Sequence, residues 1–178
     1  MPDLLIRPSV AADLPAIAAI YAESVLHGTS SFELDPPDLT EMSRRHSEVL
    51  AESLPWLVVQ RQQQVLGYAY ASQFRPRAAY RFSVEDSVYL APQARGQGLG
   101  RCLLAELIAR CEVRGARQML AVIGDASPGS IALHAALGFR HVGLLSAVGW
   151  KFDRWCDVVL MQLSLGVGNA RAADEAGR

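Results

Sequence analysis

The sequence predicts one α/β domain with a mixed central β-sheet flanked by helices. The chain has 178 residues, a length that suits one hydrophobic core. Its periodic segments follow the order strand, two helices, three strands, helix, strand, helix and two strands. This order is not a repeating strand-helix-strand series, so a mixed sheet is expected rather than a parallel one. We therefore expect one domain over residues 1–165 and a flexible tail of small, polar residues over 166–178.

The chain begins with a strand followed by a helix. The apolar stretch "LLIRPS" at residues 4–9 predicts a short strand. Residues 11–25 have the spacing of an amphipathic helix. Its apolar stripe consists of Leu14, Ile17, Tyr21 and Val25.

A second, more polar helix and three strands come next. Asp38 and Glu41 stand three residues apart, which predicts an N-cap and capping box for a helix ending near Ser53. The segments that follow are rich in β-branched and aromatic residues, as strands are. These strands are predicted at residues 56–61, 65–74 and 82–90.

The second half of the chain predicts two further helices and three strands. From Gly98 to Gly115 the sequence reads as a helix packed on the sheet. Its stripe is Leu99, Leu103, Leu107 and Cys111. A buried strand, a short helix closed by a glycine and a pair of strands around a turn at Asp153 are then predicted. The first two lie at residues 119–124 and 127–138.

Composition excludes several classes of protein. The formal net charge of −1 gives no electrostatic reason to expect nucleic acid as a partner. No apolar run approaches the roughly 20 residues of a bilayer span, and the N-terminus has no secretory pattern, so a cytoplasmic protein is expected. Cys102, Cys111 and Cys156 lack metal-ligand spacing, which predicts reduced, mostly buried thiols and no metal site.

The stretch "EDSVYLAPQARGQGLGR" places three glycines where a strand gives way to a helix. Such a loop presents bare backbone N–H groups and the positive end of a helix dipole, which favours phosphate binding. The spacing fits neither a Walker loop, which needs Lys and then Ser or Thr after its last glycine, nor the dinucleotide fingerprint. What remains is the pattern Arg95-x-x-Gly98-x-Gly100.

This pattern resembles the pyrophosphate loop of Gcn5-related N-acetyltransferases. "IRPSVAADLPAIAAIY" is similar to the first strand and helix of that superfamily, and "SIALHAALGFRHVG" to its last helix and following strand. The resemblance spans residues 4–163. Three blocks are similar to the subgroup that acetylates phosphinothricin and methionine sulfone or sulfoximine: "FRPRAAYRFSVEDSVYL", "AVIGDASPGSIALHAALGFRHVG" and "VGWKFDRWCDVVLMQ".

The resemblance implies that acetyl-CoA is the cosubstrate and that no metal is needed. Main-chain groups of Val88, Tyr89 and Leu90 would bind the pantetheine arm as an added strand does. Ser127 stands where the family often has an Asn that contacts the pantetheine. The pyrophosphate would lie on the loop formed by Arg95, Gly96, Gln97, Gly98, Leu99, Gly100 and Arg101.

Two residues are candidates for acid-base chemistry. Acetyl transfer needs a neutral amine, and the resemblance places Glu85 beside the acetyl group as a base, direct or through water. Recognition of the ammonium without proton removal is its alternative role. His134 stands where many relatives carry a Tyr that protonates the leaving thiolate. A thiol of ordinary pKa also leaves without an acid, so both possibilities remain open. The oxyanion is expected to take a main-chain N–H near Tyr89.

The acceptor is expected to be the α-amino group of a small amino acid. Arg75 and Arg77 would bind its carboxylate or another oxyanion, whereas Arg81 is left unassigned. The resemblance adds Asp86 and Ser87 to this pocket. Phe32, in the segment "TSSFE", is expected either to form a wall of the pocket or to belong to the core. Two alternatives are an acetyltransferase of peptide or protein N-termini and a CoA-binding regulator without turnover. A homodimer is expected from the subgroup, with the closing strands near the partner.

Overall fold

The computed structural model describes residues 4–172, and within them the chain forms seven strands and four α-helices. The helices are α1 (Leu14–His27), α2 (Leu39–Ala51), α3 (Leu99–Val113) and α4 (Pro128–Ala135). The strands are β1 (Leu4–Pro8), β2 (Trp56–Arg61), β3 (Gln64–Gln73), β4 (Ser83–Leu90), β5 (Gln118–Gly124), β6 (Arg140–Lys151) and β7 (Arg154–Ser164). The order of elements predicted from the sequence is confirmed.

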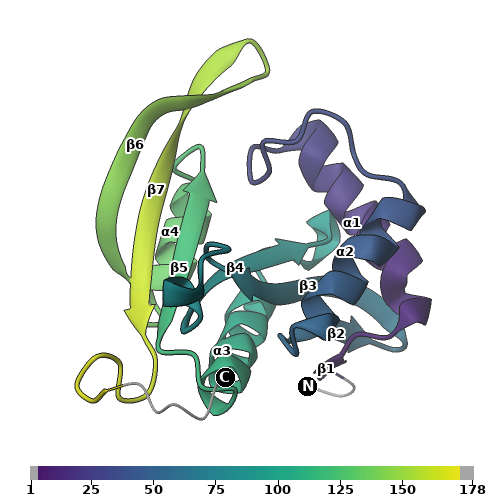
Figure 1. The fold of residues 1–178 in the computed structure, drawn as a ribbon. Coiled ribbons are helices and arrows are strands. Elements are labelled where there is room, and N and C mark those ends of the chain that lie inside the picture. The colour runs from purple at the N-terminus through teal and green to yellow at the C-terminus, as the bar shows by residue number, and fades with distance from the viewer. Residues whose placement is uncertain (1–3, 173–178) are drawn as a thin grey trace.

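All seven strands belong to one sheet, in the order β1-β2-β3-β4-β5-β7-β6 (Figure 1). Neighbouring strands run antiparallel except β4 and β5, which are parallel. The predicted mixed α/β sheet is therefore confirmed.

The parallel pair is short, and this determines the shape of the molecule. Only Ser83–Glu85 of β4 pair with β5, whose partners there are residues 118–120. Beyond this point β4 continues along β3 as far as Leu90, and β5 continues along β7 as far as Gly124. The two strands therefore separate, leaving a fork whose facing strand edges pair with no other described strand.

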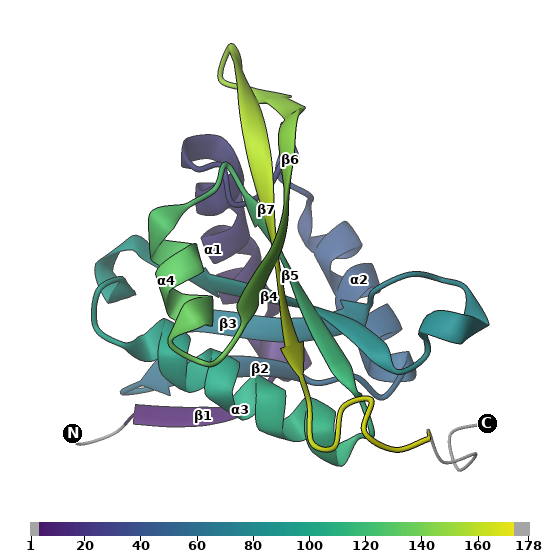
Figure 2. The ribbon, with the colours of Figure 1, turned by 90° about the vertical axis from the view of Figure 1, so that its left-hand side faces the viewer.

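Helices cover both faces of the sheet. Figure 2 shows α3 and α4 on one face and α1 and α2 on the other. The predicted stripes face the core, since every stripe residue of α1 and α3 is buried. Burial of these apolar side chains is the main force that holds the helices on the sheet.

The ends of several elements differ from the prediction for local reasons. A 3₁₀ turn at residues 11–13 precedes α1, whose first turn contains Pro15, a residue without the N–H that an earlier helical turn needs. Asp38 caps α2 by accepting a hydrogen bond from the N–H of Glu41 (2.8 Å). The Glu41 carboxylate bonds Arg44 and Arg45 instead of completing a capping box, and α2 ends at Ala51.

The remaining predictions on the chain have mixed outcomes. The turn at Asp153 is confirmed, with Phe152 and Asp153 both at positive φ between β6 and β7. All three cysteines are free, but Cys102 is exposed while the other two are buried. The tail is described to residue 172, where it makes short turns, and residues 173–178 lie outside the described part. Among the described helices, none is long and apolar enough to cross a membrane.

We predict that Leu103→Ala lowers the free energy of unfolding by about 2–5 kcal/mol, because the side chain is fully buried between α3 and the sheet. Denaturant titration of both proteins measures this difference. Val113→Ala, on the same helix but 91% exposed, is the control and should change the free energy by less than about 0.5 kcal/mol. Equal effects of the two substitutions would contradict the assigned core.

Candidate active site

A cleft of about 500 Å³ occupies the fork between β4 and β5. One wall is the free edge of β4 from Glu85 to Leu90, and the opposite wall is β5 from Ala121 to Gly124. Residues of α4, of the end of α1 and the segment after it, and of the glycine-rich loop before α3 complete it. The cleft lies at the carboxyl ends of the two parallel strands, the edge at which α/β sheets commonly bind ligands.

Adjacent side chains of β4 point to opposite faces of the sheet. Glu85, Ser87 and Tyr89 pair with Ser72, Tyr70 and Tyr68 of β3, and the ring of Tyr89 packs edge-on against Tyr21 of α1 (5.1 Å between ring centroids). This set therefore faces α1 and α2. Asp86 lies on the other face, where it meets α4.

Glu85 is half-buried at the point where the fork opens. Burial raises the pKa of its carboxyl group, the negative charge of Asp86 raises it further, and Arg75 lowers it. A carboxylate with a raised pKa is a better proton acceptor at neutral pH than an ordinary surface Glu. The aromatic face around it stays protonated, since burial raises the pKa of Tyr21 to about 12 and that of Tyr89 well above its usual value.

His134 and Asp86 form a buried pair across the base of the cleft. The Nε2 atom of His134, on α4, is 2.9 Å from the Oδ2 atom of Asp86 on β4. Its Nδ1 atom is 2.7 Å from the carbonyl oxygen of Ser130. Burial alone lowers the pKa of His134, but the hydrogen bond and charge of Asp86 outweigh burial and raise it. Asp86 thus lines the same cleft as Glu85 and Ser87, but its side chain lies on the opposite face of β4.

The glycine loop has the geometry of an anion cradle. Gly96 and Gly98 have φ values of +71° and +78°, which L side chains rarely adopt, and Gly98 directly precedes α3. A Cβ atom added at either position would meet no other described atom within 4 Å, so the backbone is open to a ligand. The loop fits a pyrophosphate placed at the helix N-terminus, and hence the phosphate end of acetyl-CoA.

The cleft brings together many, but not all, of the residues predicted to contact acetyl-CoA. Those that line it are Val88, Tyr89, Leu90, Arg95, Gly96, Gly100 and Ser127. Leu99 belongs to the core, and Arg101 is exposed. The side chain of Gln97 donates to the carbonyl of Gln93 and Gly98 caps α3, so both lie beside the cleft rather than in its wall.

Phe32 is not among the residues that line the cleft, and lies instead beside the end of β5, which forms one of the cleft walls. Its ring occupies the space beside two glycines: a Cβ atom on Gly149 would come within 2.2 Å of the ring, and one on Gly124 within 3.2 Å. The buried Lys151 donates from Nζ to the carbonyl of Ser31 (2.7 Å). The segment with Phe32 is thus packed against β5 and the β6–β7 hairpin.

The three arginines of "FRPRAAYRF" occupy different surroundings. Arg75 stacks on the ring of Phe74 (4.8 Å to the centroid), close enough to Glu85 for its charge to lower the pKa of that carboxyl. Arg77 is exposed at the start of a 3₁₀ turn. Arg81 lines a second cavity on another side of the sheet.

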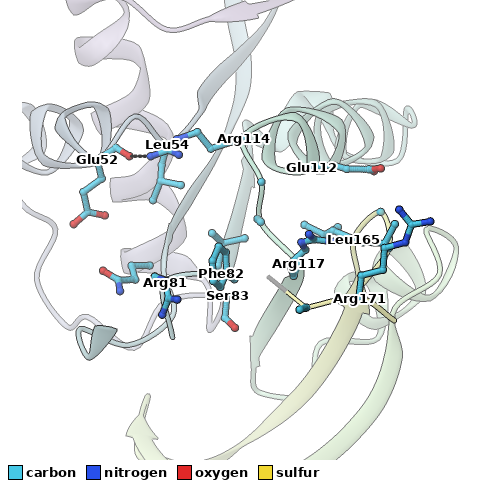
Figure 3. A pocket seen from close by; sticks show the side chains of 17 residues that line it. Glu52, Leu54, Arg81, Phe82, Ser83, Glu112, Arg114, Arg117, Leu165 and Arg171 are labelled. Atoms are coloured by element: carbon cyan, nitrogen blue, oxygen red, sulfur yellow. Dashed lines mark hydrogen bonds between the residues drawn. The ribbon is translucent and has the colours of Figure 1, made fainter. Parts of the chain in front are cut away.

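This second cavity has a volume of about 860 Å³, and one of its arginines has a structural role. Figure 3 shows Arg81, Arg114, Arg117 and Arg171 around it, together with Glu52 and Glu112. Arg114 donates to the carbonyls of Glu52 and Ser53 (2.9 and 3.1 Å), which follow the end of α2. Carbonyls at a helix end lack helical partners, so this arginine serves to satisfy them.

Sequence reasoning missed one wall of the cleft. It did not assign Ala121–Gly124, although "MLAVIG" was predicted as a strand, nor the polar residues contributed by the ends of α1 and the start of α4. Ligands commonly bind at the carboxyl ends of parallel strands, so the end of the strand predicted at "MLAVIG" could have been recognised as a wall of the site. Within residues 4–172, no group of three or more His, Cys, Asp or Glu side chains is placed to hold a metal ion.

Comparison with known proteins agrees with this geometry. The model of the acetyltransferase (GNAT) family matches residues 18–139, which include the fork, the glycine loop and α4. The chain belongs to the acetyltransferase (GNAT) family. As a member of this family it is an acetyltransferase, and acetyl-CoA is its cosubstrate.

Three proteins illustrate its similarity within the family. It is 57% identical over 158 residues to a phosphinothricin N-acetyltransferase of Alcaligenes faecalis, covering 88% of this chain and 80% of the relative. It is 40% identical over 161 residues to an L-methionine sulfoximine/L-methionine sulfone acetyltransferase of Pseudomonas aeruginosa, covering 90% and 94%. The crystal structure of a Sinorhizobium meliloti phosphinothricin acetyltransferase in complex with acetyl-CoA has a TM-score of 0.95 and 51% identity, covering 97% and 94%.

Proposed function

We propose that this acetyltransferase acetylates the α-amino group of a small amino acid or analogue, such as phosphinothricin, methionine sulfone or methionine sulfoximine. The observation that carries the proposal is the high identity, over most of each chain, to relatives named for these acceptors. The site supports it, because a carboxylate of raised pKa and an arginine lie together beside an aromatic wall.

In this proposal Glu85 receives a proton from the acceptor ammonium, directly or through one water. The resulting neutral amine attacks the acetyl group without an acyl-enzyme. Main-chain N–H groups near Tyr89 stabilise the oxyanion that forms. Arg75 and Arg77 bind the carboxylate or side-chain oxyanion of the acceptor, Ser87 lies beside Glu85 on the same face, and Phe32 closes the pocket.

His134 is proposed as the group that gives a proton to the departing thiolate. It lines the cleft from α4, and the hydrogen bond and charge of Asp86 raise its pKa, which favours the protonated ring. Departure without an acid remains the alternative. The residues proposed to hold acetyl-CoA are the β4 edge, the glycine loop and Ser127, as predicted from the sequence, and the site of action is proposed to be cytoplasmic.

The first experiment measures thiol release from acetyl-CoA in the presence of phosphinothricin, methionine sulfone, methionine sulfoximine, glutamate, methionine or a short peptide. Mass spectrometry identifies each product. We expect acetylated sulfone, sulfoximine or phosphinothricin and an unmodified peptide. Activity confined to the peptide would assign the protein to N-terminal acetylation, and acetyl-CoA binding without any product would favour a regulator.

Replacing Glu85, the proposed base, should remove the decrease of kcat at low pH. Because the Glu85 pKa is raised, its proton-accepting form is lost as pH falls through that value, and kcat falls with it. Glu85→Gln should lower kcat by about 10²–10⁴-fold at saturating acceptor. Glu106→Gln, on the outer side of α3, is the control. An unchanged kcat across pH would exclude Glu85 as the base.

Arg75 should act on the acceptor rather than on acetyl-CoA. We expect Arg75→Ala to raise the KM of the amino acid by at least about tenfold, the loss of one charged hydrogen bond, with little change in the KM of acetyl-CoA. Arg81→Ala is the matched control, because Arg81 lines the other cavity. Steady-state kinetics that vary each substrate separately measure both constants. Equal increases in both would point to damaged folding.

We also propose that the protein is a homodimer whose interface includes β6. This strand forms an edge of the sheet, and the apolar side chains exposed on the β6–β7 hairpin gather there. They are Val142, Leu144, Leu145, Val148, Trp150, Phe152 and Trp155.

Sedimentation velocity at micromolar concentration tests the dimer. The unaltered protein should sediment as a dimer and Val148→Glu as a monomer, since the substitution places a charge in the interface. Val113→Glu, an exposed valine on α3, should remain dimeric. A monomeric unaltered protein, or equal behaviour of the two variants, would contradict the proposal.

A further inference from the structure

The hydrogen bonds of His134 determine how many protons its ring carries. Nδ1 lies 2.7 Å from the carbonyl oxygen of Ser130, four residues earlier on α4. A carbonyl oxygen only accepts hydrogen bonds, so Nδ1 must be the donor and must carry a proton. The tautomer in which only Nε2 is protonated is therefore excluded by this contact.

The second ring nitrogen faces a carboxylate. Nε2 lies 2.9 Å from Oδ2 of Asp86, so one more proton is shared between the two groups. Either the ring is a doubly protonated imidazolium beside a carboxylate, or a neutral ring accepts from a protonated carboxyl. The pair has no net charge in either arrangement.

The surroundings of Asp86 keep the second proton in the pair, and the hydrogen bond and charge of Asp86 outweigh burial in raising the pKa of His134 toward the imidazolium. The side chains of His134 and Asp86 are only 5% and 2% exposed, and Oδ1 of Asp86 has no hydrogen-bond partner among the described residues. His134 is thus the one described group that donates to this carboxyl. If the ring lost its second proton, a buried carboxylate would remain without a donor, which is costly.

The other titratable groups near the pair do not replace this proton. Cys111 of α3 is held as a neutral thiol, because burial and then the charge of Asp86 raise its pKa to about 12. Glu85 lies on the opposite face of β4, and Arg75 acts on Glu85. The remaining aromatic neighbour is the ring of Phe139, edge-on to His134 at 4.9 Å.

We infer that Asp86 is a positioning residue that keeps His134 doubly protonated at the base of the fork, so that an imidazolium meets the departing thiolate. This inference rests on the proposed function of His134 and assigns to Asp86 a role other than contact with the acceptor. It also gives the two neighbouring carboxylates different tasks, one on each face of β4.

The protons balance in this scheme. Glu85 takes one proton from the ammonium of the acceptor. The proton that Nε2 of His134 donates toward Asp86 passes to the thiolate: the hydrogen bond to Asp86 and the Nε2–H bond break, and an S–H bond forms. This leaves a neutral ring whose Nε2 lone pair faces the Asp86 carboxylate. Because that contact is repulsive, the ring regains a proton from solvent, and Glu85 releases its own proton to solvent.

Nitrogen NMR of the protein labelled with ¹⁵N-histidine tests the protonation state directly. At pH 7.5 we expect both ring nitrogens of His134 to show protonated shifts, with the signal assigned by its loss in His134→Gln. In Asp86→Asn the amide can donate to Nε2, so a neutral ring with its proton on Nδ1 is expected. A neutral His134 ring in the unaltered protein would overturn the inference.

The pH dependence of kcat tests the consequence for turnover. In the unaltered protein the imidazolium is lost as pH rises through the raised pKa of His134, so the basic limb lies at higher pH than it would without Asp86. In Asp86→Asn this limb should move to lower pH, with kcat at pH 8.5 reduced by about 10²-fold and the KM of acetyl-CoA little changed. The acid limb should also move slightly lower, because Asp86 raises the pKa of Glu85.

A matched variant separates this role from a structural one. Asp13→Asn also removes a buried carboxylate, here one paired with Arg7 and outside the cleft. Asp13→Asn should lower the free energy of unfolding without moving the acid or the basic limb of the pH profile of kcat. Equal pH profiles for Asp86→Asn and the unaltered protein would overturn the positioning role.

The two levels of the proposal fail in distinguishable ways. If no amino acid is acetylated, the proposed function is wrong, and the NMR result for His134 still stands by itself. If acetylation occurs but His134 is neutral, the function holds and the inference about Asp86 is wrong.

Discussion

The brevity of the pairing between β4 and β5 is the constraint on which the site depends. After residues 83–85 the two strands separate, because β4 stays with β3 and β5 stays with β7. The separation leaves main-chain groups of β4 without a strand partner on one side, and unpaired peptide groups require hydrogen bonds from elsewhere. A ligand with amide groups along an extended arm, such as pantetheine, suits this edge. The glycine loop at the end of β4 then lies where the phosphates of that ligand would follow.

Much of this arrangement was predictable because it depends on local sequence. The glycine loop could be placed at a strand-to-helix junction since "EDSVYL" alternates and the leucines after Gly98 have helical spacing. Apolar periodicity likewise gave the buried faces of α1 and α3. These features involve residues a few positions apart, where backbone geometry alone fixes which side chains share a face.

What the sequence did not reveal arises from contacts between distant segments. Phe32 packs against Gly124 and Gly149, and no local pattern relates these three positions. The pair of Asp86 and His134 joins residues 48 positions apart, so its protonation could not be deduced before α4 was placed against β4. Alternation of side chains along β4 would have predicted that Asp86 and Glu85 lie on opposite faces of the sheet. The family resemblance instead assigned both residues to the acceptor site.

Glu85 and Asp86 are consecutive residues, but their side chains lie on opposite faces of the sheet and in two different chemical environments. The face that carries Glu85 contains the tyrosines and the segment of Phe32, and the face that carries Asp86 contains α3 and α4. In the proposed mechanism, substitutions on the first face alter which amine is accepted and leave the pair of Asp86 and His134 on the second face intact. Under this proposal one strand separates the selection of the acceptor from the proton donor for the thiolate, because consecutive side chains of β4 face opposite sides of the sheet.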